Sequence, residues 1–443
     1  MPKHVKINQK IKPFNKVIKV PGDKSLSIRW ALLASQAIGK SKAYNLLRSE
    51  DVMSTLKGLR KLGVKIKFYK NYCEIYGVGI NGFKYKKNLT IDAGNSGTFG
   101  RLILALLIKS PFKIKLIGDK SLSKRDFSRV INPLKEFGAS FYPKNKSRLP
   151  FYIKGTNFVR PIKYFEKKGS AQIKSCIMLA SLNSPGTTKI NAKKSRNHTE
   201  ILYKFLKLPI IVRNTKKTDI IEIDGEKKIY PFNYNIPSDI SSSAFFIVLA
   251  LLSKKSYLVI KNVNINSSRT GCISILNKMG ANIVFKNKKK YNGEKIADIH
   301  VKSKNYFKAI NCPTKYNSSA IDEFLVIFLV AAKANGISYF KDLEELNQKE
   351  SPRLTLGSKI LNMMGIKTKL TKSSIKIYGN PNLELNKSFE IKNYLKDHRV
   401  MALSTIAALT LGGKMWKIHN PESINTSFPS FFKILKSLGA RIN

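Results

Sequence analysis

The sequence predicts an α/β protein of two domains, each built from three βαβαββ repeats with buried helices. Six segments share one pattern, in which apolar residues three apart precede a glycine, or a proline in the third copy, and mostly alternating apolar residues follow. They are LRKLGVKI at Leu59, LKEFGASF at Leu134, FLKLPIIV at Phe205, LNKMGANI at Leu276, LNMMGIKT at Leu361 and LKSLGARI at Leu435. The pattern is typical of the end of an amphipathic helix, its C-cap and a following strand. The intervals of 75, 71, 71, 85 and 74 residues suit two helices and three or four strands per repeat.

A second helix is predicted in each repeat, upstream of the shared pattern. The six segments are SIRWALLASQAI, NSGTFGRLILALLI, GSAQIKSCIMLASL, ISSSAFFIVLALL, SAIDEFLVIFLVAA and DHRVMALSTIAALTL. Because they are apolar nearly all round, we expect these helices to be buried in the middle of each domain. Their polar N-termini carry unpaired N–H groups and partial positive charge, so together they predict an anion-binding surface.

The domain limits follow from where the repeats break. A chain of 443 residues is long for one core and predicts two or three domains. The stretch NIPSDISSS at Pro237 interrupts the pattern roughly midway and leaves three repeats on each side. The strand candidate FNKVIKV, before Pro21, is assigned to the later repeats. We therefore expect a first domain at 21–237 and a second domain formed by 1–20 together with 238–443, with two chain crossings that make a hinge.

Composition excludes several classes of protein. The four cysteines (Cys73, Cys176, Cys272 and Cys312) are far apart and form no C-x-x-C pair, which predicts neither a zinc site nor a disulfide framework. The N-terminal sequence lacks the apolar core of a signal peptide, and the longest apolar runs are about half a membrane span. We expect a cytoplasmic protein without a metal.

The formal charge of +54 invites a nucleic-acid interpretation, but only 14 of the 81 basic residues are arginine and the lysines are spread along the whole chain. This distribution favours a general drift of surface composition over a dedicated polyanion surface.

One octamer occurs twice. GDKSLSIR at Gly22–Arg29 returns as GDKSLSKR at Gly118–Arg125. A glycine turn, a lysine, two hydroxyls and an arginine are groups that proteins use to bind phosphate or carboxylate. The alternative is a solvated helix start, because short Ser/Lys strings are common in a lysine-rich chain.

Ten motifs of this chain resemble, in the same order, those of the 5-enolpyruvylshikimate-3-phosphate (EPSP) synthase family. They are PGDKSLSIR, DAGNSGTFGR, GDKSLSKR, GSAQIKS, SRNHTE, PSDISSSAF, SSAIDE, NQKESPRL, DHRVMA and TSFPSF, between about residues 13 and 441. GSAQ and SRNHTE are similar to the class II bacterial branch. The resemblance implies the two-domain inside-out α/β barrel of enolpyruvyl transferases. It also implies transfer of the enolpyruvyl group of phosphoenolpyruvate to the 5-hydroxyl of shikimate 3-phosphate, with release of phosphate and without a cofactor. We further expect a monomer that binds neither nucleic acid nor a membrane.

The resemblance implies binding residues in the first domain. Lys24 and Ser25 are placed at phosphoenolpyruvate and shikimate 3-phosphate, and Arg29 on the shikimate carboxylate. Asn95, Gly97 and Arg125 are placed at phosphoenolpyruvate, Ser170, Ala171 and Arg196 at the 3-phosphate, and Gln172 at both substrates. Lys120, in the second octamer, receives no role. A serine such as Ser170 is also a common helix N-cap, and capping does not exclude phosphate binding.

Two carboxylates stand out in the second domain because their surroundings are so basic. The resemblance implies that Asp322 accepts the proton of the 5-hydroxyl and that Glu350 donates a proton to the methylene carbon of phosphoenolpyruvate. Arg353 and Arg399 are implied to bind phosphoenolpyruvate and Lys349 to bind substrate, and Lys24 is a further candidate for proton transfer. Cations beside Glu350 should depress its pKa, whereas bound anionic substrates should raise it. Which carboxylate serves which half-reaction stays open, and domain closure on the substrates is expected to complete the site.

Some positions depart from the family pattern, and two other functions are disfavoured. Pro352 stands where Asp is usual, and Thr426 stands where the other branch has lysine, so Thr426 receives no role. Gly97 stands where strongly glyphosate-tolerant relatives have alanine, which predicts sensitivity to glyphosate.

The enolpyruvyl transferase that acts on a UDP-sugar is disfavoured, since its lysine is followed by asparagine where this chain has Ser25. A nucleic-acid-binding protein of βαβ repeats is disfavoured because no strip of interleaved aromatic residues and arginines is evident.

Overall fold

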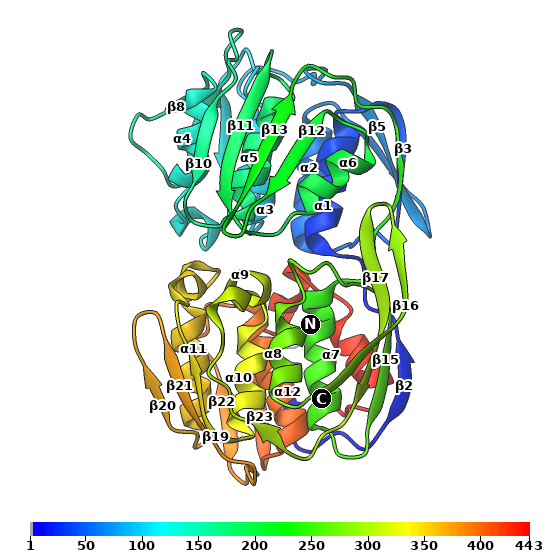
Figure 1. Ribbon diagram of the computed structural model, residues 1–443, viewed down its shortest axis with the longest axis vertical. Coiled ribbons are helices and arrows are strands. Elements are labelled where there is room, and N and C mark those ends of the chain that lie inside the picture. Colours follow the sequence, from blue (N-terminus) through cyan, green and yellow to red (C-terminus); the bar gives the residue numbers. More distant parts are fainter. Residues whose placement is uncertain (1–2) are drawn as a thin grey trace. The chain divides into compact units, whose positions relative to one another are not determined.

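The computed structural model describes residues 3–443 and divides them into two compact units (Figure 1). The first unit comprises Gly22–Ile236 together with Lys290–Glu294. The second unit comprises the residues before Gly22, Pro237–Lys289 and Lys295–Asn443. Each unit encloses its own cluster of buried apolar side chains. The domain limits expected from the sequence remain a prediction.

The first unit contains three four-stranded sheets, with strand orders β14-β3-β5-β4, β6-β7-β9-β8 and β10-β11-β13-β12. Its strands are β3 (Ile38–Tyr44), β4 (Lys65–Phe68), β5 (Tyr72–Val78), β6 (Thr90–Asp92), β7 (Ile114–Ile117), β8 (Ser140–Tyr142), β9 (Phe151–Lys154), β10 (Lys163–Glu166), β11 (Thr187–Lys193), β12 (Ile210–Asn214), β13 (Thr218–Asp224) and β14 (Asn233–Asn235). Its helices are α1 (Lys24–Ser35), α2 (Glu50–Lys61), α3 (Gly97–Leu106), α4 (Ser128–Glu136), α5 (Ala171–Ser181), α6 (His198–Phe205) and the 3-10 helix η1 (Leu122–Lys124). In each sheet one parallel pair is continued by antiparallel strands, as a βαβαββ repeat requires.

The second unit contains two four-stranded sheets, β16-β17-β15-β2 and β18-β19-β21-β20, and one three-stranded sheet, β1-β23-β22. Its strands are β1 (His4–Ile7), β2 (Asn15–Ile18), β15 (Tyr257–Asn264), β16 (Asn282–Tyr291), β17 (Glu294–Lys302), β18 (Phe307–Lys308), β19 (Ala334–Phe340), β20 (Thr368–Leu370), β21 (Ile375–Gly379), β22 (Ser388–Ile391) and β23 (Met415–His419). Its helices are α7 (Ile240–Leu252), α8 (Gly271–Lys278), α9 (Asn317–Ala320), α10 (Phe324–Ala332), α11 (Arg353–Met363), α12 (His398–Leu411) and α13 (Phe431–Ser437), with the 3-10 helices η2 (Thr314–Tyr316), η3 (Glu344–Gln348) and η4 (Pro421–Thr426). The described residues 3–443 therefore form six repeats, three in each unit.

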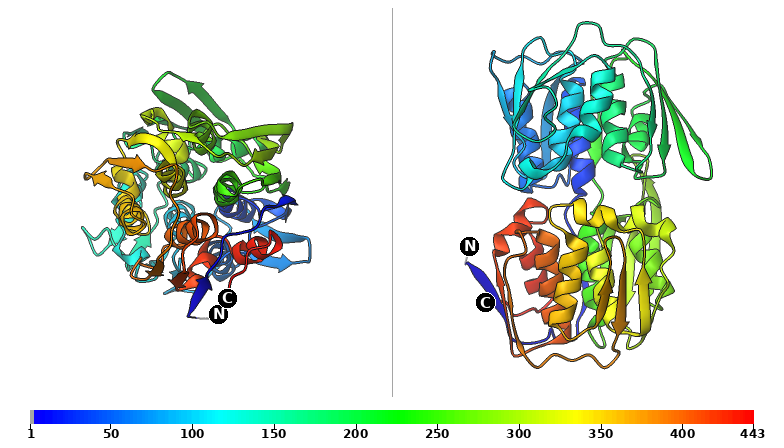
Figure 2. Two further views of the ribbon diagram at one scale, coloured as in Figure 1. Left: turned by 90° about the horizontal axis from the view of Figure 1, so that it is seen from below. Right: turned by 90° about the vertical axis from the view of Figure 1, so that its left-hand side faces the viewer.

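Three sheets include strands from distant parts of the chain. β2, the strand expected to join the later repeats, pairs in parallel with β15. β14 pairs in parallel with β3 and supplies the first strand of the first repeat. The sixth repeat departs from the pattern, since the described residues after α13 form no strand and β1 pairs with β23 instead. There the Lys6 amide donates to the Asn443 carbonyl at 2.7 Å, and β1 lies beside the C-terminal residues (Figure 2).

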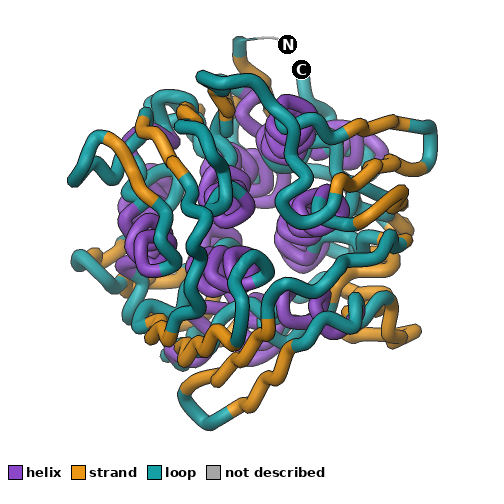
Figure 3. The backbone as a smooth tube through the Cα atoms, turned by 90° about the horizontal axis from the view of Figure 1, so that it is seen from above, coloured by secondary structure: helices purple, strands orange, loops and turns teal. Residues whose placement is uncertain are grey.

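The apolar helices lie inside each unit, and the strands lie toward its outside (Figure 3). α12 is buried over all its residues, and α7 is buried from Ile240 to Leu251. Such helices must be covered on every face, which the sheets and neighbouring helices of the unit do. Among the described residues, the structure contains no helix that combines the length and apolarity needed to cross a bilayer.

In the third copy of the helix-end pattern, the helix ends earlier than the sequence predicts. In the other five copies the expected glycine adopts a positive φ after the helix, for example 87° at Gly63. In the third copy this conformation falls at Lys207, with a φ of 55°, and not at Pro209. α6 ends at Phe205 with Leu206 as its C-cap. The pyrrolidine ring fixes φ near about −65°, so a proline cannot occupy the left-handed C-cap position and instead follows it.

One predicted buried helix is interrupted. The segment SAIDEFLVIFLVAA forms α9 and α10, with a turn at 321–323 between them. Glu323 is buried in this turn, and its carboxylate accepts a hydrogen bond from the Ser241 hydroxyl on α7. This buried contact anchors the turn, which carries Asp322.

Candidate active site

The two octamers share a cap but differ in the structure that follows it. The Asp23 carboxylate accepts from the Leu26 amide at 2.9 Å, and the Asp119 carboxylate accepts from the Leu122 amide at 2.7 Å. The first copy then continues into α1, whereas the second forms η1 and leaves Arg125 extended. Only the first octamer therefore starts a buried helix, and Lys120 in the second is exposed.

Lys24 forms an ion pair that the sequence did not predict. Its Nζ lies 2.7 Å from Asp51 Oδ2, and the Asp51 side chain is 9% exposed. Asp51 stands in the first turn of α2, where a carboxylate also interacts favourably with the helix dipole. The only sequence signal was an acidic pair at a helix start in a chain with few acids. The pair fixes the position of the Lys24 ammonium group.

The Arg29 guanidinium is held almost completely inside the first unit. Its side chain is 4% exposed. Nε donates to Thr199 Oγ1 at 2.9 Å, Nη2 donates to Ser175 Oγ at 2.9 Å, and Nη1 donates to the Ser25 carbonyl at 3.2 Å. Residues of α1, α5 and α6 thus meet at one cation.

Two arginines lie close to the start of α3. Arg125 Nη2 donates to Asn95 Oδ1 at 3.4 Å, and Asn95 Nδ2 donates to Asp119 Oδ2 at 2.6 Å. A Cβ atom at Gly97, the first residue of α3, would lie 3.0 Å from Arg125 Nη1 and 3.1 Å from Arg101 Nη1. Glycine at this position is what lets both guanidinium groups approach the helix N-terminus.

The start of α5 is joined to the start of α3 through Arg101, which the sequence analysis did not select. Gln172 Oε1 accepts from Arg101 Nη1 at 2.7 Å, and Gln172 Nε2 donates to Thr98 Oγ1 at 3.0 Å. Ser170 is the N-cap of α5, and Ala171 is its first residue. Arg196 is half-buried, one residue before the N-cap of α6. Arg101 lies in the quoted motif DAGNSGTFGR, so its place next to a helix N-terminus was the available signal.

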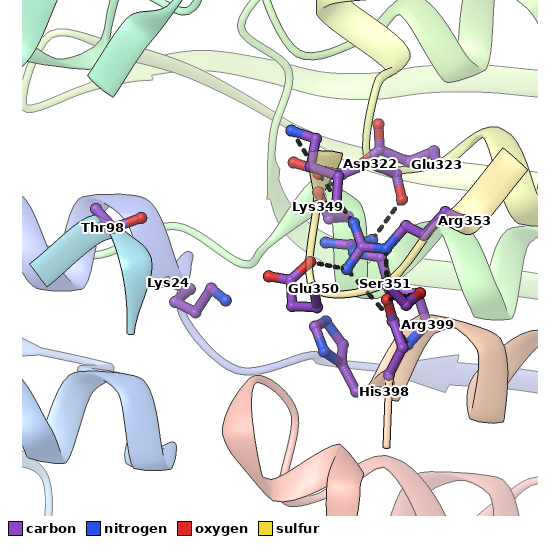
Figure 4. Close-up of polar contacts among 12 residues, drawn as sticks. Lys24, Thr98, Asp322, Glu323, Lys349, Glu350, Ser351, Arg353, His398 and Arg399 are labelled. Atoms are coloured by element: carbon purple, nitrogen blue, oxygen red, sulfur yellow. Dashed lines mark hydrogen bonds and ion pairs between the residues drawn. The ribbon is translucent and has the colours of Figure 1, made fainter. Parts of the chain in front are cut away.

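In the second unit one buried arginine joins three carboxylates (Figure 4). The Arg353 side chain is 1% exposed. Its Nε donates to Asp397 Oδ2 at 2.9 Å, its Nη2 donates to Glu350, and its Nη1 lies 3.5 Å from Asp322 Oδ1. The guanidinium group therefore sets the positions of both expected proton-transfer residues.

The remaining predicted residues of this unit contact Asp322. Lys349 Nζ lies 3.6 Å from Asp322 Oδ1, and Arg399 Nη1 donates to the Asp322 carbonyl at 2.7 Å. Asp397, which the sequence analysis missed, is the N-cap of α12 and accepts from the Arg399 amide at 2.9 Å. The structure thus connects all five predicted residues of this unit into one network.

Burial and neighbouring charges shift the pKa values of Asp397 and Arg353 in opposite directions. Burial alone would raise the pKa of Asp397, but the adjacent Arg353 guanidinium outweighs it and the pKa lies below its usual value. Burial alone would lower the pKa of Arg353, but Asp397, Glu350 and Asp322 together raise it. Asp397 is therefore ionised and Arg353 protonated throughout the neutral range.

Comparison with known proteins gives one result over nearly the whole chain. The sequence model of the family EPSP synthase (3-phosphoshikimate 1-carboxyvinyltransferase) matches residues 8–435. The 3-phosphoshikimate 1-carboxyvinyltransferase of Ruthia magnifica subsp. Calyptogena magnifica is 40% identical over 438 residues, which cover 98% of each chain. That of Zymomonas mobilis is 36% identical over 98% of this chain and 96% of the relative.

Solved structures agree with the sequence comparison. EPSP synthase from Acinetobacter baumannii superposes with a TM-score of 0.87 at 34% identity, covering 100% of this chain and 99% of that chain. The enolpyruvyl transferase NikO from Streptomyces tendae superposes with a TM-score of 0.78 at 13% identity, covering 99% of this chain and 98% of that chain. The second likeness concerns the fold alone, and it confirms the expected inside-out α/β architecture of enolpyruvyl transferases.

Proposed function

The chain belongs to the EPSP synthase family, the 3-phosphoshikimate 1-carboxyvinyltransferases of the shikimate pathway, and on this premise we propose how its residues perform that reaction. The substrates are phosphoenolpyruvate and shikimate 3-phosphate. The 5-hydroxyl oxygen bonds to C2 of phosphoenolpyruvate while C3 gains a proton, which gives a tetrahedral adduct. The C2–phosphate bond then breaks and C3 loses a proton, which yields the enol ether and inorganic phosphate.

The first unit is proposed to bind the two anions. Arg125 and Arg101 lie over the start of α3, next to Asn95 and Gly97, and this arrangement suits the planar carboxylate and the phosphate of phosphoenolpyruvate. For shikimate 3-phosphate the proposed groups are Ser25, Arg29, Ser170, Ala171, Gln172 and Arg196. Helix N-termini supply further N–H donors for a phosphate.

The second unit is proposed to supply the proton transfers. Asp322 accepts the proton of the 5-hydroxyl, and Glu350 delivers a proton to C3. The observation that carries this assignment is the network around Arg353, which holds both carboxylates and includes Lys349 and Arg399. Glu350 accepts a charge-assisted hydrogen bond from Arg353, which favours its ionised form. It therefore becomes an acid only when bound substrate anions compete for the cations around it.

The proposed reaction is tested by mixing the protein with both substrates. We expect release of inorganic phosphate that requires shikimate 3-phosphate as well as phosphoenolpyruvate, and that does not require an added metal. Phosphate release with a UDP-sugar in place of shikimate 3-phosphate would overturn the assignment. A monomeric, cytoplasmic enzyme is proposed, and light scattering of the purified protein tests its oligomeric state.

A methyl group at Gly97 is expected to disturb phosphoenolpyruvate binding. In Gly97→Ala the new Cβ would lie about 3 Å from a terminal nitrogen of Arg125 and of Arg101, so both guanidinium groups must shift. We expect KM for phosphoenolpyruvate to rise about tenfold, because misplacing an arginine pair weakens two charge-assisted hydrogen bonds. KM for shikimate 3-phosphate is the internal comparison and should rise less, because Arg101 affects that substrate only through Gln172, which accepts from Arg101 Nη1. Steady-state kinetics with each substrate varied in turn measure both, and equal rises would contradict the assignment.

The same glycine predicts inhibition by glyphosate. We expect potent inhibition of the unmodified enzyme that is competitive with phosphoenolpyruvate, because Gly97 leaves room for the inhibitor beside the two arginines. Gly97→Ala should weaken this inhibition more than it weakens phosphoenolpyruvate binding. Inhibition constants for the two proteins provide the comparison, and an unmodified enzyme that resists glyphosate would contradict it.

A further inference from the structure

Three consecutive polar residues at the start of α6 are almost completely buried. His198, Thr199 and Glu200 are 1%, 1% and 4% exposed. Each binds a different partner within the first unit: His198 Nδ1 lies 2.6 Å from Glu294 Oε1, Thr199 Oγ1 accepts from Arg29, and Glu200 Oε1 lies 2.6 Å from Lys174 Nζ. Burying such a run is costly unless every group is paired, so the pairings themselves need an explanation.

The pairs of α6 with α5 are adjacent along both helices. Lys174 and Ser175 follow each other on α5, and Thr199 and Glu200 follow each other on α6. Ser175 Oγ and Thr199 Oγ1 lie 2.7 Å apart, next to the Lys174–Glu200 ion pair, whose lysine is fully buried. The ion pair thus fixes the register between two helices that jointly present a pair of hydroxyl groups.

Both hydroxyls accept hydrogen bonds from one guanidinium. Arg29 Nε binds Thr199 and Arg29 Nη2 binds Ser175, each at 2.9 Å. Arginine has a long, flexible side chain, and two fixed acceptors on one edge restrict it to a single orientation. A ligand that meets an arginine already ordered loses less conformational entropy on binding.

We propose that Thr199 and Ser175 are positioning residues that preorganise Arg29 for the carboxylate of shikimate 3-phosphate, and that the Lys174–Glu200 pair sets the helix register this requires. The proposal rests on the proposed function, in which Arg29 binds that carboxylate. Neither hydroxyl needs to touch the substrate. Their effect reaches it through the orientation of Arg29 alone.

The test compares two buried threonines. Thr199→Val removes the hydroxyl that accepts from Arg29 Nε and keeps the side-chain shape. Thr188→Val, on β11, is the matched control, because Thr188 is also fully buried and its hydroxyl has no hydrogen-bond partner. We expect Thr199→Val to weaken binding of shikimate 3-phosphate by up to about tenfold, the effect of having to order one long side chain when the ligand binds. Thr188→Val should bind like the unmodified protein.

Isothermal titration calorimetry with shikimate 3-phosphate alone measures this affinity, and steady-state kinetics add a second readout. We expect Thr199→Val to raise KM for shikimate 3-phosphate while kcat and KM for phosphoenolpyruvate change less than about twofold. Combining the substitution with Arg29→Ala separates positioning from general damage. In the Arg29→Ala background Thr199→Val should have no further effect on affinity.

The outcomes of these experiments distinguish failure of the positioning role from failure of the proposed function. If the unmodified protein turns over both substrates but Thr199→Val binds shikimate 3-phosphate as Thr188→Val does, the positioning role is wrong and the function stands. An equal loss of affinity with and without Arg29 also overturns the positioning role. If the unmodified protein releases no phosphate, the proposed function is wrong. A loss of shikimate 3-phosphate affinity specific to Thr199→Val would still support the positioning role in that case.

Discussion

Replacing Glu350 with glutamine is expected to lower kcat by about 10²–10⁴-fold, the usual contribution of a general acid or base. Glutamine keeps the shape of the side chain and can still accept a hydrogen bond from Arg353, but it cannot deliver a proton to C3 of phosphoenolpyruvate. Shikimate 3-phosphate should bind nearly as well as before, because its proposed binding groups belong to the first unit. The loss should therefore appear in kcat and not in the affinity for that substrate.

The matched control for this substitution is Glu344→Gln. Glu344 is a glutamate in η3, close in sequence, but its side chain is exposed. Stopped-flow and steady-state phosphate release should show normal turnover for Glu344→Gln and a large loss for Glu350→Gln. Near-normal turnover of Glu350→Gln would remove Glu350 from the mechanism and leave Asp322 or Lys24 as the proton donor.

The repeated architecture could be predicted because its signals are local. Apolar spacing, a C-cap glycine and alternation lie within a few residues of one another, so six copies could be recognised without any tertiary information. The third copy shows the limit of this approach. Its register was misjudged because Pro209 stood where a glycine was expected, while Lys207 adopts the left-handed conformation through the helix end at Phe205.

The two octamers show a second limit. Nearly identical residues form the same aspartate cap in both, yet one copy continues as α1 and the other stops after η1. The copies differ at Ile28, where the second copy has Lys124, and in the residues that follow. Ile28 and Trp30 are completely buried in the first copy, whereas Asp126 in the second accepts from the Ser128 amide at 2.8 Å at the start of α4. The shared residues determine the turn, and the residues that differ determine whether a long helix follows it.

The site was predicted as a set of residues but not as a network. Resemblance selected Arg353 as a ligand of phosphoenolpyruvate, and that role remains a prediction. The structure surrounds its guanidinium with Asp397, Glu350 and Asp322, which lie 44, 3 and 31 residues away in sequence. Only the packing of α11 against the start of α12 brings the first of these into contact, so no local pattern could reveal it. Asp51 beside Lys24 was missed for the same reason.

Replacing Arg353 with methionine is expected to lower the free energy of unfolding by about 3–5 kcal/mol at pH 7, the usual cost of leaving a buried charge without its partner. Asp397 is completely buried, and Arg353 supplies the attraction that holds the pKa of Asp397 below its usual value. Without the guanidinium, burial alone acts on this carboxyl and raises its pKa. The remaining bonds, from Ser351 and the Arg399 amide, are too few to offset the lost cation.

The pH dependence of this loss follows from the sign of the shift. A carboxyl whose pKa is lower in the folded protein stabilises it above the pKa of the unfolded chain, about 3.9, and this stabilisation disappears as the pH falls through the lower folded value. In Arg353→Met the pKa of Asp397 is raised instead, so the deficit should be largest near pH 8, shrink as the pH falls through this raised pKa, and shrink further below about pH 4, where the unmodified protein loses its own stabilisation. Urea denaturation over this range measures it. Arg213→Met is the control, because Arg213 is 61% exposed and pairs only at the surface with Glu222, so its loss should cost less than about 1 kcal/mol at every pH. A deficit for Arg353→Met as small as that of Arg213→Met would show that the buried network does not stabilise the second unit.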